Sequence, residues 1–219
     1  MKAFVLLAAA IVTCASVPAE AQNTPPRVLF DIGATVLGGG SLGSADAVYT
    51  TPSGGAFTLF STSQSWSAGA GVVGHLQIRL TPRVQLEVSE SWTRPEIRSS
   101  ITGDFEGAAN TVATQTVHQF MTSGGLVLSF APRGRFRPFA RGAVSWMRHL
   151  SNDQTLYRDG VAADIGGGVV YAWADRNGHI KPYGLRADVF VNVRSGGLDL
   201  AKKSRVIAPG FSASFIFKL

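Results

Sequence analysis

Cysteine is almost absent from this chain of 219 residues, in which Cys14 is the one example. It lies in a segment with a lysine near its start, a short apolar run at residues 3–12 and a small-x-small site at residues 19–21. This order is typical of a secretory signal peptide, so we predict a leader at 1–21 and a mature chain at 22–219. The cleavage site beyond Cys14 argues against a lipoprotein acylated there. A mature chain without cysteine has no disulfide, thiol chemistry or thiolate metal site.

Long apolar runs and clustered metal ligands are missing as well. The apolar run of the leader is too short to span a bilayer as a helix, and no later run reaches that length. The four histidines, His75, His118, His149 and His179, are scattered without the spacing of metal ligands. No helix is expected after the glycine run at 166–168, so this run is not a nucleotide loop. We therefore predict no metal and no cofactor.

Charge is moderate and dispersed. The formal net charge is +6, and removing the leader takes away one charge of each sign. Since the lysines and arginines are not clustered and the chain is predicted to be exported, a nucleic-acid partner is not expected. Solvated turns and contact with anionic lipid head groups account better for the basic balance.

Alternation of apolar residues with small or charged ones is abundant, and it is clearest within residues 161–194. Two alternating runs flank an Asn-Gly pair at 177–178, which is a strong hairpin signal. One face of each run is apolar, while Asp164, Arg186 and Asp188 lie on the other. The runs also exceed the roughly five or six residues usual for strands of soluble domains. This pattern is typical of a hairpin in a transmembrane barrel, apolar toward lipid and polar toward the lumen.

The same alternation over the whole chain predicts an all-β fold. We expect eight strands, at about residues 27–37, 64–80, 83–94, 114–130, 136–150 and 205–219 with two more within 161–194. Short turns alternate with longer connections, and the longest connections, 38–63 and 95–113, are predicted to be loops. The predicted fold class is therefore an eight-stranded antiparallel up-and-down transmembrane β-barrel. Its termini are expected in the periplasm and its long loops outside the cell.

Outward aromatic residues sort into two belts under this assignment, as expected at the two membrane interfaces. The periplasmic belt comprises Phe30, Phe130, Phe136, Trp173, Tyr183 and Phe217, and the outer belt comprises Trp66, Trp92, Phe120 and Trp146. Glu90 falls on the lipid side, and we expect a bulge or a position near the rim to accommodate it.

Several segments resemble the small outer-membrane barrels of Gram-negative bacteria, the group of OmpA-type transmembrane domains and opacity-type proteins. They are Arg137-Pro138-Phe139, Asp159-Gly160 before 165–169, the run 184–189 and the alternating aromatic C-terminus. The resemblance covers the mature chain and implies an integral outer-membrane protein in contact with lipid and lipopolysaccharide. It also implies that the barrel-assembly machinery recognises the C-terminal strand, where Phe215 and Phe217 keep the spacing of that signal.

Six charged residues are predicted to face the lumen of the barrel. They are Arg79, Glu87, Arg141, Asp164, Arg186 and Asp188. A barrel of eight strands is just wide enough for side chains to fill it, and buried charges must be paired. We predict a salt-bridged interior, and the alternative is a narrow gated ion pore in which the pairs exchange partners.

One tetrapeptide raises an enzymatic alternative. His149-Leu150-Ser151-Asn152 resembles the His-x-Ser-Asn motif of lipid A deacylases, in which an imidazole activates a hydroxyl. Those enzymes use a downstream glutamate, whereas this region offers only aspartates, and alternation places His149 on the lumen face rather than toward lipid. We therefore assign no catalytic residue and keep a lipid A-modifying hydrolase using His149 and Ser151 as an alternative.

The expected function is non-enzymatic. The barrel would anchor and stiffen the envelope, and the segments 38–63 and 95–113 would meet partners outside, because exposed loops on a rigid scaffold commonly carry binding. The kind of partner and the oligomeric state do not follow from the sequence.

Overall fold

The computed structural model describes residues 28–130, 134–151, 157–175, 179–196 and 205–218. The predicted leader, 1–21, lies outside the described residues. Within them the strands are β1 (Val28–Leu37), β2 (Gly40–Thr50), β3 (Ala56–Trp66), β4 (Gly69–Arg79), β5 (Val84–Thr93), β6 (Glu96–Thr102), β7 (Thr111–Ser129), β8 (Phe136–Ser151), β9 (Tyr157–Ala174), β10 (Ile180–Gly196) and β11 (Val206–Lys218). No helix in these described ranges is long and apolar enough to cross a membrane.

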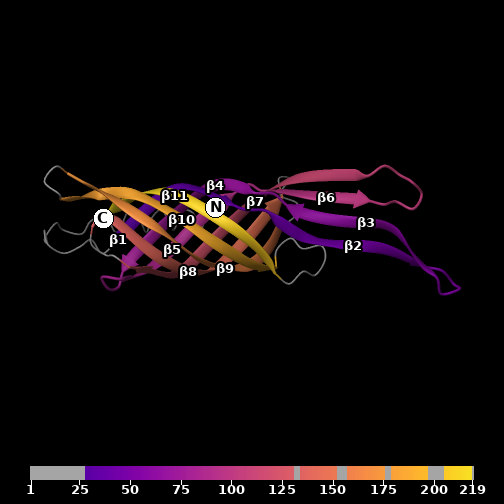
Figure 1. Cartoon of the computed structure of the whole chain (residues 1–219), viewed down its shortest axis with the longest axis horizontal. Helices are drawn as coiled ribbons and strands as arrows, with labels where there is room; N and C mark the ends of the chain where they lie inside the picture. Colours follow the sequence, from indigo (N-terminus) through magenta and orange to yellow (C-terminus); the bar gives the residue numbers. More distant parts are fainter. Residues whose placement is uncertain (1–27, 131–133, 152–156, 176–178, 197–204, 219) are drawn as a thin grey trace.

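Eight of these strands form a closed antiparallel barrel. Their order is β1-β4-β5-β7-β8-β9-β10-β11, and β11 pairs with β1 to close the ring. Each barrel strand therefore lies beside its neighbours in the chain, which confirms the predicted up-and-down barrel (Figure 1). We call the end with the connections β4–β5, β7–β8 and β9–β10 the short-turn end.

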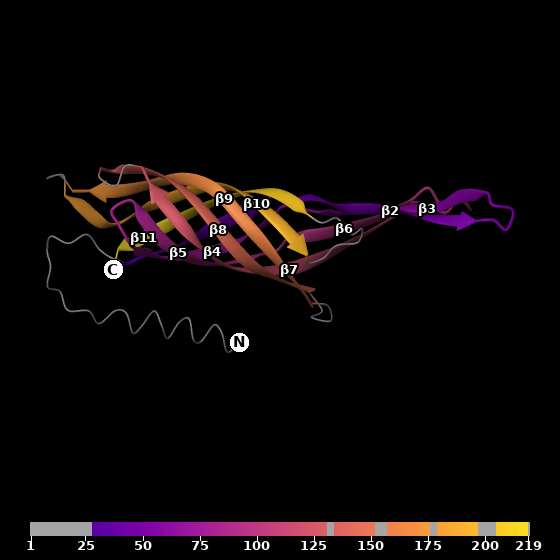
Figure 2. The same ribbon diagram turned by 90° about the horizontal axis from the view of Figure 1, so that it is seen from below.

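The remaining strands form a sheet that projects from the opposite end of the barrel. β2, β3, β6 and the first residues of β7 pair in that order, and both views show them reaching well beyond the barrel (Figures 1 and 2). We call this sheet, residues 40–66 and 96–116, the extension. The prediction that 38–63 and 95–113 are loops is therefore wrong over most of their length. Serine, threonine and glycine face water on both sides of most of the sheet, so no hydrophobic alternation marks these strands in the sequence.

The tip of the β2–β3 hairpin is a tight turn. The backbone N–H of Thr51 donates to the carbonyl of Gly55, and that of Gly54 donates to the carbonyl of Thr51. Gly54 has a φ of 86°, a conformation that glycine adopts without steric cost.

Burial follows the alternation that the sequence predicts. Ile32, Val144 and Ile165 are among the large apolar side chains exposed on the outer surface, whereas Asp31, Asp164 and Arg186 are buried inside. A soluble barrel would show the opposite distribution, because its apolar side chains would fill the interior. An apolar outer wall around a polar interior is the arrangement that transmembrane barrels require.

Aromatic rings form a belt at the short-turn end, as predicted. Phe136, Tyr171, Trp173, Tyr183 and Phe215 follow one another with ring centroids 5.0–6.2 Å apart. At the other end Trp92, Phe120 and Trp146 are at least partly exposed on the outer wall.

Trp66 does not belong to this outer belt, and the sequence prediction is wrong here. It is the last residue of β3, two residues separate it from the start of β4, and its side chain is only 3% exposed. The predicted single strand 64–80 is therefore broken at Ser67 and Ala68. Because of this break, the inward and outward positions of β4 cannot be extended back to Trp66. Its indole lies inside, among buried residues of the extension.

Glu90 lies on the outer wall without a bulge. Its Oε2 accepts a hydrogen bond of 2.6 Å from the hydroxyl of Thr122, the residue opposite it on β7. A neighbouring hydroxyl rather than a backbone irregularity thus accommodates this carboxylate.

Candidate functional site

Arg186 of β10 is the centre of a charged cluster in the barrel lumen. It is 1% exposed and contacts three carboxylates from three strands. Its Nε and Nη2 donate to Asp188, each at 2.9 Å in the shortest contact, while Nη1 donates to Glu87 at 2.6 Å and Asp31 at 3.3 Å. Such charge-assisted, bidentate contacts are the strong form of the hydrogen bond.

An imidazole and a second guanidinium complete the cluster. The Nδ1 of His75 lies 2.5 Å from Asp31 Oδ1, and the Nε of Arg141 lies 3.6 Å from Glu87 Oε1. Three carboxylates thus face two guanidiniums and one imidazole. We call these six residues, Asp31, His75, Glu87, Arg141, Arg186 and Asp188, the lumen cluster.

Aromatic rings cover both guanidiniums, and glycines make room for the rings. The guanidinium of Arg186 lies 4.8 Å from the ring centroid of Phe139, and that of Arg141 lies 5.4 Å from that of Phe190. A Cβ at Gly210 would lie 2.3 Å from the Phe190 ring. Glycine at this position therefore leaves room in the lumen for the Phe190 ring.

The structure divides the six predicted lumen charges among three levels. Glu87, Arg141, Arg186 and Asp188 meet in the lumen cluster. Asp164 lies one level nearer the extension, where it accepts hydrogen bonds from Ser145 at 3.0 Å and Asn192 at 2.7 Å. Arg79 lies at the short-turn end and makes no ion pair with the described residues, so the prediction of one shared network is wrong for these two.

Asp31 and His75 are the members that the sequence reasoning left out. Alternation already placed both on the inner face, and their burial at 1% exposure agrees with it. Membership in the cluster depends on register instead, because Asp31 of β1 lies directly opposite His75 of β4. A test for charged residues at matching heights on neighbouring strands would have found this pair.

Two apolar layers close the lumen above the charges. The lower layer contains Leu37, Met121, Met147 and Ala208, with Phe190 packed against it. The upper layer contains Leu42, Trp66, Ile97 and Val117, and it joins the barrel to the extension. A packed apolar layer offers an ion no ligands in place of water, so this arrangement does not favour an ion pore.

His149 lies between the two apolar layers. It is 2% exposed, its Nε2 lies 3.2 Å from Gln119 Oε1, and its ring packs edge-on against Trp66 at 4.9 Å. Ser151 is 3% exposed and also faces inward. Acyl chains outside the barrel therefore do not reach this pair, and the geometry does not favour the hydrolase alternative.

Metal ligands do not gather anywhere in the described part of the chain. No group of three or more histidine, cysteine, aspartate or glutamate side chains within it could hold a metal ion. The carboxylates of the lumen cluster are instead directed at Arg186.

A closed eight-stranded barrel with an apolar wall and a charged, filled lumen defines the class: this is a barrel of the outer-membrane type. Comparison with solved structures agrees. Neisserial surface protein A matches with a TM-score of 0.57 and 11% identity over 90% of this chain and 100% of its own. The outer-membrane protein OprG from Pseudomonas aeruginosa matches with a TM-score of 0.53 and 10% identity over 91% and 99%. Neither protein-family models nor curated proteins match the sequence.

Proposed function

We propose that this protein is a non-enzymatic surface protein of the outer membrane, in which a sealed barrel anchors an extension that binds partners outside the cell. The observation that carries the proposal is the joint between the two parts. The upper apolar layer includes Trp66 of β3 and Ile97 of β6 together with Val117 of the barrel strand β7. A sheet held to its anchor by a packed layer presents a surface of defined shape rather than a mobile loop.

The composition of the extension suits contact with a partner in water. Its exposed residues include Val48 and Tyr49 of β2 and Phe105 beyond β6, and the rings of Tyr49, Phe57 and Phe105 lie in contact at 5.5 and 4.7 Å. Tyrosine is among the side chains most enriched at binding hot spots, and phenylalanine is enriched in the cores of protein interfaces. The outer wall of the barrel would contact lipid and lipopolysaccharide. The last strand, β11, which closes the ring, would be recognised by the barrel-assembly machinery.

Labelling of introduced cysteines tests the orientation that this function requires. Ser53→Cys at the tip of the extension should react with a membrane-impermeant maleimide in intact cells. Thr81→Cys at the short-turn end should react only after the outer membrane is permeabilised. The mature chain is predicted to lack cysteine, so these substitutions should give the only signal, and a Cys14→Ser background serves as the control. The reverse labelling pattern would place the extension in the periplasm and exclude surface binding.

Shortening the extension tests its role in binding. Ser44 and Ser63 lie opposite each other in register, so joining them with a two-residue Asn-Gly turn should remove the tip and leave the barrel intact. We expect cells that display the shortened protein to lose about tenfold or more of their binding to matrix proteins or phage. The matched control is Thr81→Ala, which changes the other end of the barrel. Equal binding by wild-type and shortened proteins, at equal surface amounts, would refute the proposal.

A further inference from the structure

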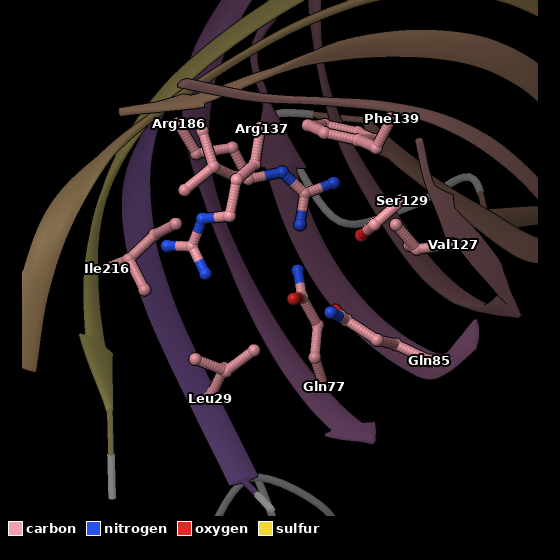
Figure 3. Close-up of a pocket in the computed structure, with 10 residues that line it drawn as sticks. Leu29, Gln77, Gln85, Val127, Ser129, Arg137, Phe139, Arg186 and Ile216 are labelled. Carbon is pink, nitrogen blue, oxygen red and sulfur yellow. The ribbon is translucent and has the colours of Figure 1, made fainter. Parts of the chain in front are cut away.

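A small cavity lies inside the barrel below the lumen cluster, at the short-turn end. Its volume is about 30 Å³, and its polar lining comes from Gln77, Gln85, Ser129, Arg137 and Arg186. Figure 3 shows the amide and hydroxyl groups of this lining and both guanidiniums directed toward a common centre. Gln85 is the second residue of β5 and Ser129 is the last residue of β7, so the cavity lies close to the turns at that end.

Positive charge accumulates around this cavity without a matching carboxylate. Arg137 lines it, Arg79 is near enough to repel Arg137, and Lys218 is repelled by both. The carboxylates of the lumen cluster are already paired with Arg186, Arg141 and His75. Among the described residues, none of the three cations at the short-turn end takes part in an ion pair. Each of the three side chains is partly buried, and the close approach of like charges is unfavourable when water only partly screens them.

Two donors of this group also lack acceptors. The Nε–H groups of Arg79 and Arg137 are buried and have no hydrogen-bond partner among the residues that the structure describes. Gln77 is held in place because its Nε2 donates to Glu87 Oε2 at 3.0 Å, and Gln85 is only 8% exposed. The lining of the cavity thus includes one cation without an ion pair, Arg137, with an unpaired Nε–H group, and two glutamines held in place, while two further cations lie near Arg137.

We propose that this cavity is a binding site for a small inorganic anion of about the size of chloride, held by Arg137 on the side next to Arg79. A cavity volume of roughly 10–15 Å³ holds one water molecule. The volume of this cavity, about 30 Å³, therefore admits a monatomic anion but not a sugar or a nucleotide. The anion would accept a hydrogen bond from the Nε–H group of Arg137, and its charge would offset part of the repulsion among Arg137, Arg79 and Lys218. The lumen cluster and the apolar layers above it fill the barrel on the far side of the site. The anion therefore binds from the short-turn end and does not cross the barrel.

Anion exchange at constant ionic strength tests this site. Thermal unfolding of the refolded full-length mature protein in lipid vesicles, followed by gel mobility, is measured while gluconate is replaced by chloride. Gluconate is too large to enter the cavity. We expect chloride to raise the midpoint by about 3 °C, because a ligand that binds only the folded state stabilises it. The shift should disappear in Arg137→Gln and fall in Arg79→Gln, and it should persist in Arg83→Gln, a control on the exposed turn next to β5.

The measured quantity is the difference between the two salts in each variant, so a change in the midpoint of Arg137→Gln itself does not affect the result. If a variant does not fold, crystals of the wild-type protein grown in bromide keep the proposal testable. An anomalous peak in the cavity beside Arg137 supports it. An empty cavity in those crystals, equal midpoints of the wild type in both salts, or a chloride shift unchanged in Arg137→Gln would each overturn it.

Discussion

Replacing Arg186 with methionine should destabilise the folded barrel by about 3–5 kcal/mol, the usual cost of removing one partner from a buried ionic group. Asp31, Glu87 and Asp188 would keep their positions but lose the guanidinium that all three contact. Arg141, at 3.6 Å from Glu87, reaches only one of them. Urea unfolding in lipid vesicles, followed by tryptophan fluorescence and gel mobility, measures the loss.

Two further variants make this result specific to the lumen cluster. Arg148→Gln removes a charge whose bridge to Asp159 is more than a third exposed, so it should cost at most about 1 kcal/mol. Adding Asp31→Asn and Asp188→Asn to Arg186→Met should recover much of the lost stability, because Glu87 then keeps Arg141 as its partner and the other two carboxylates are gone. If Arg186→Met unfolds at the same urea concentration as Arg148→Gln, the cluster does not stabilise the barrel.

Replacing Trp66 with alanine should release the extension from the barrel. Truncating a buried tryptophan typically costs about 3–5 kcal/mol, and Trp66 packs with Leu42, Ile97 and Val117 in the upper apolar layer. The loss should be local, because the barrel keeps its own ladder of paired strands. Amide hydrogen exchange in β2, β3 and β6 is expected to accelerate by on the order of 10²- to 10³-fold, while exchange in β9 and β10 stays unchanged.

Trp146→Ala provides the matched control for this loss. Trp146 is 44% exposed on the outer wall, away from both apolar layers. Its removal should leave exchange in the extension as in the wild type. Slow exchange in β2 and β3 of Trp66→Ala would show that backbone pairing alone holds the extension, and that the joint proposed to stiffen it is unnecessary.

The barrel strands could be predicted because a membrane imposes two opposite environments on every strand. Ile165 and Val189 had to face lipid, and Asp164 and Asp188 had to face the lumen, so alternation carried the information directly. The extension could not be predicted in this way. Ser44, Ser63 and Ser100 lie on a sheet with water on both sides, where backbone pairing is the main requirement and leaves little trace in the sequence.

The sequence alone thus determined whether each residue of a barrel strand faces the lumen or the lipid, because side chains alternate between the two faces along a single strand. Which charges meet was decided only by the tertiary structure, because it depends on the register between strands that close the ring. Register brings Asp31 opposite His75 and leaves Arg79 at the short-turn end, although all three share the inner face. The position of Trp66 was decided in the same way, since the break before β4 turns its side chain from the lipid side into the lumen.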